Sequence, residues 1–343
     1  MDHRLLGNSG LSVSVLSFGT MTIGGRDRFG KMGNLGVSET SRMLGLCQDA
    51  GLTTIDTADM YSSGASEEIL GEALKGRRQR FVLATKAFMR MGPAPHDIGL
   101  SRRHLMEACE ASLRRLQTDC IDLYICHQPD QFVPVEETMR AYDDLVSQGK
   151  VRYIGCSNHS AWHVMKALGV SERLGLVRYI CQQVNYSLVA RDIEHEIVPM
   201  GLDQRVGVMA WSPLQAGLLT GKFRRDTRPE VSRLNELDAP GTIDYDRLYR
   251  IVDVLDAIAL ERNATPSQVA LNWVLNKPGV DTVIVGARHE AQLKDNLAAA
   301  TWRLTAEEMT RLDEVSALPE PYPHWHQHKF GVERNPPTPR LRS

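Results

Sequence analysis

Four residues in the first half of the chain carry the side chains that proton transfer to a substrate oxygen needs. Asp56, Lys86 and His127 each end a short apolar, β-branched run, and Tyr61 follows Asp56 by five positions. A phenol is a natural proton donor, but its ordinary pKa of about 10 holds the proton too tightly near neutral pH. A lysine ammonium ~4 Å away would stabilise the phenolate by up to ~4 kcal/mol at an effective dielectric of about 20. This set predicts acid catalysis by Tyr61, tuned by Lys86.

The other two residues have supporting roles in the same chemistry. Reduction of a carbonyl by hydride transfer places negative charge on its oxygen, so a proton donor must lie beside it. We expect Asp56 to pair with Lys86 and hold it in place, and a neutral His127 to donate a hydrogen bond to the substrate oxygen. Taken one at a time, these residues are more simply explained as a turn cap, a surface ring, a solvated ammonium and a structural imidazole. Their joint placement at strand ends predicts catalysis.

The elements that must position these residues alternate between short apolar runs and longer amphipathic stretches, which is typical of an α/β protein with a parallel sheet. Apolar residues at helical spacing predict helices over 38–50, 102–116 and 136–148. Eight strand–helix units in one series predict a (β/α)8 TIM barrel, in which functional residues gather at the carboxyl ends of the strands. The predicted strands are 15–19, 53–56, 81–86, 121–127, 151–156, 179–184, 207–211 and 282–286.

A doubly wound open sheet is the alternative architecture. Its dinucleotide fingerprint G-x-G-x-x-G should follow the first strand, and the sequence GTMTIGG at 19–25 does not supply it. The segment GLLTGKF at 217–223 also differs from a phosphate-binding P-loop, since three residues separate its glycines and Phe replaces Ser or Thr. The barrel is therefore the favoured fold, with residues 1–318 as a single domain.

Three segments fall outside the repeat. The apolar runs at 3–7 and 11–15 flank GNSG, which predicts a β-hairpin that plugs the closed end of the barrel. Residues 212–243 form a long segment of the kind that is usually functional or disordered. Residues 319–343 form a tail that we expect over or beside the barrel mouth. Its HWHQH sequence at 324–328 would bring three histidines to one face of an extended strand, but no cysteine or carboxylate pattern joins them, and no metal site is predicted.

Composition narrows the class of protein. The 343 residues carry a formal net charge of −2, which provides no electrostatic basis for binding nucleic acid or an anionic membrane. The six cysteines form no CxxC pair, and several lie inside apolar runs, as expected in a reducing compartment. The first residues lack the long apolar core of a signal peptide, and no apolar stretch approaches the length of a membrane span. These features predict a cytoplasmic protein.

Six segments resemble the aldo-keto reductase family in sequence, order and spacing. They are DTADMYSSGASEEILGEAL, ATKAF, IDLYICHQPD, GKVRYIGCSN, WSPLQAGLLTGKF and GARHEAQLKDN. The resemblance runs from about residue 4 to residue 317. Within the family, the segments are similar in style to those of the bacterial oxidoreductases and the potassium-channel β-subunits. It implies the same four catalytic residues, with Tyr61 as the acid.

The resemblance also implies a nicotinamide cofactor, because no side chain can supply a hydride. It places the carboxamide against Ser157, Asn158 and Gln183, with the ring stacked on Trp211, a position where the family often has Tyr. The implied cofactor site comprises Gly19, Thr20, Met21, Asp56, Ser157, Asn158, Gln183, Trp211, Ser212, Pro213, Leu214, Gly217, Leu218, Lys222, Gly286, Arg288, Gln292 and Asn296.

Three of these residues point to a phosphorylated cofactor. Their spacing of four places Gln292 and Asn296 on one face of a helix, with Arg288 where that helix starts. An arginine fork beside a helix N-terminus suits the 2′-phosphate of NADPH. The better-known eukaryotic members carry Lys where this chain has Gly286, which removes one phosphate partner and leaves NADH as an alternative. NADPH/NADP⁺ is the predicted cofactor.

The predicted function is NADPH-dependent reduction of an aldehyde or ketone. Phe88, Met89 and Trp211, with Trp325 and Phe330 from the tail, predict an apolar pocket for a small carbonyl substrate, wide enough for a ring-bearing ketone. The alternative is a cofactor-binding redox sensor or regulatory subunit with little turnover. Loss of one of the four catalytic residues would be its hallmark, and all four are present. Whether the protein is a monomer or a homo-oligomer stays open.

Overall fold

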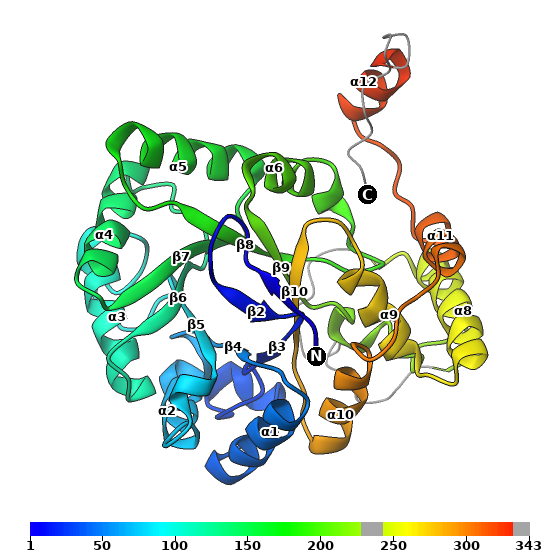
Figure 1. Ribbon diagram of the computed structural model, residues 1–343, viewed down its shortest axis with the longest axis horizontal. Helices are drawn as coiled ribbons and strands as arrows, with labels where there is room; N and C mark the ends of the chain where they lie inside the picture. The colour runs from blue at the N-terminus through cyan, green and yellow to red at the C-terminus, as the bar shows by residue number, and fades with distance from the viewer. Residues whose placement is uncertain (228–242, 332–343) are drawn as a thin grey trace.

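Eight parallel strands close into a barrel in the computed structural model, which describes residues 1–227 and 243–331 (Figure 1). The ring closes because β10 pairs with β9 on one side and with β3 on the other. The strands are β3 (Leu16–Gly19), β4 (Thr54–Asp56), β5 (Val82–Ala87), β6 (Ile121–Cys126), β7 (Val151–Ser157), β8 (Tyr179–Asn185), β9 (Gly207–Trp211) and β10 (Val280–Val285). The predicted TIM barrel is confirmed, and each predicted strand overlaps an observed one.

Helices surround this barrel and turn one apolar face toward it (Figure 1). In α4 the buried residues Met139, Tyr142 and Leu145 recur at helical spacing, and burial of such a stripe is what stabilises a surface helix. The helices are α1 (Val37–Asp49), α2 (Ala65–Ala73), α3 (Arg102–Leu116), α4 (Val135–Ser147), α5 (Ala161–Leu174), α6 (Ile197–Gln204), α8 (Tyr245–Arg262), α9 (Pro266–Leu275), α10 (Glu290–Ala298), α11 (Ala306–Val315) and α12 (His324–Gly331). Short 3-10 turns are η1 (Asp27–Lys31), η2 (Tyr61–Gly64), η3 (Arg78–Arg80), η4 (Asp192–Glu194) and η5 (Gln215–Gly217).

The interior of the barrel is layered because strand side chains alternate between its inside and its outside. An apolar cluster that includes Ala84, Ile125, Met209 and Ile284 is buried inside it. Two residues later in the sequence than each of these four are Lys86, His127, Trp211 and Gly286. The predicted functional residues therefore form the layer above an apolar floor, at the carboxyl ends of the strands.

An N-terminal hairpin covers the other end of the barrel. It pairs β1 (His3–Leu5) with β2 (Ser12–Ser14) in antiparallel register. Its loop residue Leu6 is fully buried against the apolar floor, and the Gly7 N–H donates to Asp281 Oδ2 over 2.8 Å. Gly7 has a φ of +53°, and a Cβ there would lie 2.0 Å from the Ile180 carbonyl oxygen, so only glycine fits this contact. The predicted plug is confirmed.

The described part of the tail leaves the barrel after α11 and forms α12, which projects from the body of the molecule (Figure 1). The His324 ring stacks on His195 in the loop after β8, with centroids 5.5 Å apart. The HWHQH segment is helical, so a spacing of two does not bring its histidines to one face, as an extended strand would. Within the described residues no group of His, Cys, Asp and Glu side chains could hold a metal ion.

Trp325 and Phe330 lie on α12 and are about half exposed. The ring contacts of Trp325 in the described part of the chain are with Tyr322 and His326, and those of Phe330 are with His326 and Lys329. These contacts stay within the tail. The expectation that the two rings line the substrate pocket is therefore wrong for this arrangement, because α12 packs beside the barrel through His324 and not across its mouth.

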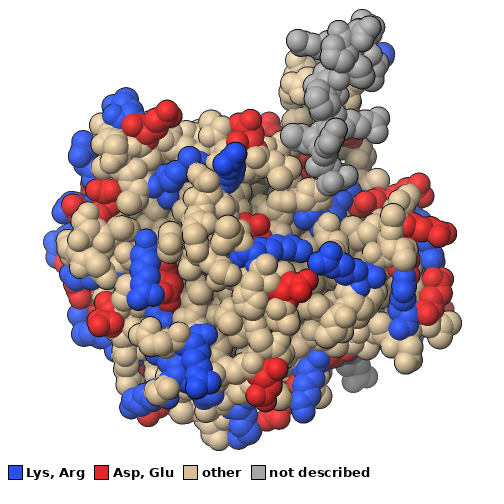
Figure 2. All heavy atoms as spheres, viewed as in Figure 1, with Lys and Arg blue, Asp and Glu red and all other residues tan. Residues whose placement is uncertain are grey.

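The surface carries mixed charge. On the face that bears the hairpin, Lys and Arg side chains are interspersed with Asp and Glu, and no large patch of a single sign forms there (Figure 2). Among the described residues, no helix combines the length and apolar character that a membrane span requires. All six cysteines are free, and five of them are buried.

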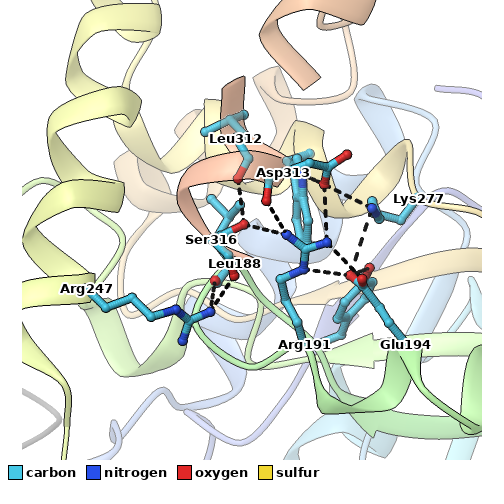
Figure 3. Close-up of polar contacts among 10 residues, drawn as sticks. Leu188, Arg191, Glu194, Arg247, Lys277, Leu312, Asp313 and Ser316 are labelled. Atoms are coloured by element: carbon cyan, nitrogen blue, oxygen red, sulfur yellow. Dashed lines mark hydrogen bonds and ion pairs between the residues drawn. The ribbon is translucent and has the colours of Figure 1, made fainter. Parts of the chain in front are cut away.

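A partly buried cluster of charged residues connects the loop after β8 to three helical segments (Figure 3). We call Arg191, Glu194, Lys277 and Asp313 the clamp cluster. Arg191 donates to both Glu194 oxygens over 2.9 and 2.8 Å, and also to the Asp313 carbonyl and the Ser316 hydroxyl. Lys277, just beyond α9, donates to Asp313 Oδ1 over 3.0 Å. Hydrogen bonds between charged groups are stronger than those between neutral ones, and here they hold these segments in one arrangement.

Candidate active site

Successive strands bring the predicted residues to one rim. Gly19 of β3 lies opposite Asp56 of β4, and Ser157 of β7 lies opposite Gln183 of β8. Asn185, which ends β8, lies opposite Trp211, which ends β9. Thr20 follows Gly19, and its N–H donates to the Asp56 carbonyl over 3.0 Å, while Met21 comes next in the same loop. Residues far apart in sequence thus meet because parallel strands end at the same edge.

Lys86 is the centre of the site. Its ammonium is fully buried and donates to Asp56 Oδ2 over 2.8 Å, to the Thr57 carbonyl over 2.7 Å and to the Tyr61 oxygen over 3.3 Å. Burial opposes the charge on Lys86, but the Asp56 carboxylate and the Tyr61 oxygen outweigh it and raise the pKa of the ammonium. Lys86 therefore keeps its positive charge near neutral pH and lies beside the Tyr61 hydroxyl.

Tyr61 begins the turn η2, which carries unusual backbone. Ser62 and Ser63 both have left-handed φ values, of 50° and 52°, and Gly64 follows with 92°. Such conformations are costly for non-glycine residues and persist where surrounding contacts hold them. Ser62 Oγ donates to the Ile23 carbonyl over 2.8 Å, and the Phe29 ring packs 5.8 Å from the Tyr61 ring. The turn therefore presents Tyr61 in a defined position.

His127 lies across from Tyr61, with ring centroids 6.2 Å apart in an edge-on arrangement. Burial, together with the Lys86 charge, lowers the pKa of His127 to about 3. The imidazole is consequently neutral at physiological pH. A neutral ring can donate one hydrogen bond without competing with Tyr61 as the acid.

Polar side chains and an indole lie beside this group. Gln183 Nε2 donates to Asp56 Oδ1 over 2.7 Å, so Asp56 bridges Lys86 and Gln183. Asn158 has a left-handed φ of 58°, donates to the His127 carbonyl and accepts from Trp211 Nε1 over 3.2 Å. Ser157 Oγ donates to the Gln183 carbonyl over 2.9 Å. This ring of contacts holds the amides and the indole at the edge of the same opening.

The segment after β9 begins with strained backbone. Ser212, Gln215 and Ala216 have left-handed φ values, and Gly217 follows with 98°. A Cβ at Gly217 would meet nothing within 4 Å, so the backbone is open on that side. Pro213 and Leu214 lie between these residues, Leu218 is buried, and Lys222 is exposed at the end of the segment. The part of the long predicted loop at 228–242 lies outside the described residues.

The start of α10 brings the last three predicted residues together. Gln292 Oε1 accepts from the Arg288 N–H over 2.9 Å, and Asn296 Nδ2 donates to the Gly286 carbonyl over 3.2 Å. The Arg288 guanidinium donates to the carbonyls of Lys31 and Met32, in and just after η1. At Gly286 a Cβ would approach no atom closer than 3.7 Å, which is ordinary contact distance. The helical spacing predicted for these residues is confirmed.

The chain matches a known protein family over most of its length. The model of the aldo/keto reductase family matches residues 15–317. The chain belongs to the aldo/keto reductase family. This confirms the resemblance found in the sequence and accounts for the barrel fold.

Three relatives show which members of the aldo/keto reductase family this chain is similar to. It is 38% identical over 306 residues to a probable voltage-gated potassium channel subunit beta of Arabidopsis thaliana, covering 87% of this chain and 91% of the relative. It is 36% identical over 331 residues to a putative subunit of the same kind from Schizosaccharomyces pombe, covering 92% and 93%. It is 34% identical over 343 residues to versiconal hemiacetal acetate reductase of Aspergillus parasiticus, covering 92% and 96%.

Aldo/keto reductases generally use NAD(P)H, and the residues at this rim fit such a cofactor. Trp211 offers a flat, partly exposed indole whose tilt is held by Asn158. Open backbone at Gly217 and Gly286 leaves room for a ligand to approach. Arg288 and the N-terminus of α10 provide a cation and backbone donors of the kind that bind phosphate.

Several residues at the site were not predicted. Phe29 packs on Tyr61, and Thr57 accepts from Lys86 through its carbonyl, which any residue type could do. Glu67 and Arg115 form a buried ion pair just behind the site, with Nε and Oε2 2.7 Å apart. Glu67 lies inside the DTADMYSSGASEEILGEAL segment, which was the one signal available for it. Phe88, predicted as a pocket wall, packs partly against the apolar core around β6.

Proposed function

We propose that this chain is an NADPH-dependent reductase of aldehydes or ketones, with Tyr61 as the general acid. The contact between the buried Lys86 ammonium and the Tyr61 oxygen, at 3.3 Å, is the observation that supports it most directly. A cation at this distance stabilises the phenolate that remains after proton donation. Asp56 accepts a 2.8 Å hydrogen bond from Lys86, which holds the lysine in place and compensates its buried charge.

The other residues of the site act on the substrate and the cofactor. When bound, the nicotinamide supplies the hydride. Trp211 supports its ring, and Ser157, Asn158 and Gln183 orient its carboxamide. His127, kept neutral by burial, donates a hydrogen bond to the substrate oxygen and aligns it with the Tyr61 hydroxyl.

Preference for NADPH over NADH rests on Arg288. Replacing it with Ala should weaken NADPH binding by roughly tenfold or more and leave NADH nearly unchanged, since only NADPH carries the 2′-phosphate. Lys294→Ala is the matched control, because Lys294 is an exposed cation on the same helix. Fluorescence titration of both cofactors measures the effect. Equal losses for NADPH and NADH would contradict the assignment of Arg288, Gln292 and Asn296.

The substrate class is a small carbonyl compound with an apolar, ring-bearing body, as the partly exposed Trp211, Phe88 and Met89 support. A cytoplasmic location belongs to the same proposal, and the six free cysteines support it. NADPH consumption with a panel of aldehydes and ketones tests the activity. Tyr61→Phe run beside the wild type should lose nearly all turnover while binding NADPH as before. Full activity in Tyr61→Phe would show that the acid is another residue.

A regulatory subunit or redox sensor is the second candidate, and the relatives named as potassium channel subunits favour it. Such a protein would bind NADPH tightly and turn over slowly. A wild type that binds NADPH but reduces no compound of the panel would support this candidate. Sustained turnover with any ring-bearing ketone would support the reductase.

A further inference from the structure

A second ion pair lies directly behind the Lys86–Tyr61 contact. Glu67 of α2 is fully buried, and each of its carboxylate oxygens has a partner. Oε1 accepts from Thr85 Oγ1 over 2.6 Å, and Oε2 accepts from Arg115 Nε over 2.7 Å. Thr85 is the residue before Lys86 on β5, and α2 directly follows the turn that carries Tyr61. One carboxylate therefore links the strand that bears the lysine to the segment that bears the tyrosine.

Arg115 supports the turn from below. It comes from the last turn of α3, and its side chain passes under Gly64, where an added Cβ would lie 2.9 Å from Arg115 Cδ. Gly64 ends the run of three left-handed residues that follows Tyr61. Strained backbone of this kind keeps its shape only while its surroundings hold it. Arg115 thus fills the space beneath the turn and anchors it to Glu67.

We propose that Thr85, Glu67 and Arg115 form a positioning network that sets the distance between the Tyr61 oxygen and the Lys86 ammonium. The inference rests on the proposed function, in which that distance controls proton donation. At 3.3 Å the contact is already at the long end of hydrogen-bond lengths, so a small outward shift of the turn would break it. The three residues touch neither substrate nor cofactor and act through Tyr61 and Lys86.

Titratable groups lie around Tyr61 on each neighbouring element. They are Lys86 on β5, Asp56 on β4, His127 after β6, Asp27 of η1 through Ser63, and Asp59 in the loop before η2. Burial and the nearby Glu67 carboxylate raise the pKa of Asp59 well above its ordinary value. Thr85→Val removes a hydrogen bond of the network without removing a charged group, so its effect on Tyr61 reports the position of Lys86.

A comparable ion pair at the opposite end of the barrel provides the matched control. Asp122 of β6 is buried and accepts from Arg78 over 2.8 Å, from Arg152 over 2.6 Å and from the Leu83 N–H over 2.9 Å. It joins β5 and β6 as Glu67 joins β5 and α2, but it lies at the start of the strands, away from Tyr61. Substitutions at Arg78 measure the cost of losing a buried pair alone.

The test uses Thr85→Val, which keeps the shape of the side chain, together with Glu67→Gln, Arg115→Met and Arg115→Lys, with Arg78→Met as control. Two readouts apply to each variant of the full-length protein. One is the split between kcat and the KM for NADPH. The other is titration of the phenolate ultraviolet band, with the same variant carrying Tyr61→Phe subtracted, which reports Tyr61 without any turnover.

We expect Thr85→Val, Glu67→Gln and Arg115→Met to lower kcat by roughly 10- to 100-fold, as misplacement of a reacting group does, with KM for NADPH within about twofold. The Tyr61 phenolate should titrate at higher pH in all three, and Arg115→Lys should recover part of both effects. Arg78→Met should lower Tm with kcat and the phenolate titration unchanged. Unchanged kcat and phenolate titration in Thr85→Val and Glu67→Gln would overturn the network. If the wild-type protein reduces no carbonyl while the variants still shift the Tyr61 titration, that result would support the network and refute the reductase.

Discussion

The molecule contains two clusters built from similar residues, each around a buried cation. The mouth cluster, which is Asp56, Tyr61, Lys86 and Gln183, lies at the rim of the strands. The clamp cluster holds Arg191, Glu194, Lys277 and Asp313, with Tyr186 bonded to it. Each contains a buried cation, a carboxylate and a tyrosine. Burial of charge by itself therefore does not distinguish a reactive site from a structural one.

The partner of each tyrosine makes the difference. Tyr186 OH donates to Glu194 Oε1 over 2.6 Å, and burial together with that carboxylate raises the pKa of Tyr186. Tyr61 OH lies beside the Lys86 ammonium, which favours the opposite charge state. In the clamp cluster the Tyr186 hydroxyl donates its hydrogen bond to a carboxylate of the protein. In the mouth cluster the phenol oxygen lies beside a cation, which is the arrangement that the proposed general acid requires.

Replacing the lysine of each cluster is the strongest test of this difference. Lys86→Met should lower carbonyl reduction by about 10²- to 10⁴-fold, the usual range for loss of assisted proton transfer. Lys277→Met should leave the rate within about twofold, because Lys277 contacts only Asp313, Glu194 and the Trp273 ring among the described residues. Steady-state rates at saturating NADPH measure both. Similar losses in the two variants would abolish the distinction.

Breaking the clamp cluster should instead affect stability. In Arg191→Met the Glu194 and Asp313 carboxylates, which are both partly exposed to water, lose a largely buried cation, and we expect a cost of about 1–3 kcal/mol of unfolding free energy. Urea unfolding followed by circular dichroism measures it, and Tyr61→Phe, expected to change stability by less than about 1 kcal/mol, is the comparison variant. A stable Arg191→Met protein with impaired turnover would reverse the roles of the clusters.

His127 sharpens the description of the mouth cluster. Because its pKa is lowered to about 3, the ring has no ionisation in the working range. We expect His127→Gln, which preserves a neutral donor, to lose roughly tenfold in kcat/KM and to retain the wild-type pH profile above about pH 5. Rates across pH measure both quantities. An acid limb near pH 6 that disappears in His127→Gln would show that the imidazole is charged.

Asp281 is a partly buried acid that belongs to neither cluster, and we expect it to affect the pH dependence of stability and not the reaction rate. Burial raises its pKa from 3.8 to about 6. The unfolded chain loses this proton at lower pH than the folded protein, so stability should fall by up to about 3 kcal/mol as pH rises from about 4 to about 6, and then level off. Asp281→Asn should remove that slope in thermal unfolding. A slope of the same size in the variant would mean that other groups cause it.

Much of the fold followed from local sequence. Alternation of short β-branched runs with amphipathic stretches is repeated along the chain, so strand ends, helix faces and the barrel were all predictable from it. The placement of Asp56, Lys86 and His127 was predictable for the same reason, since each lies where an apolar run stops and parallel strands must end at a common rim. Residue type alone then indicated an acid and the cation that tunes it.

Tertiary structure decided the contacts between distant segments. Arg115 reaches Glu67 across 48 positions, and Arg191 reaches Ser316 across 125, spacings that no local periodicity encodes. The tail turned out helical and docked through His324, because a short polar and aromatic segment adopts whichever form its neighbours stabilise. The sequence by itself determined which side chains stand at the rim. The packing of helices and turns determined how firmly, and at what distance, Tyr61 and Lys86 are held together.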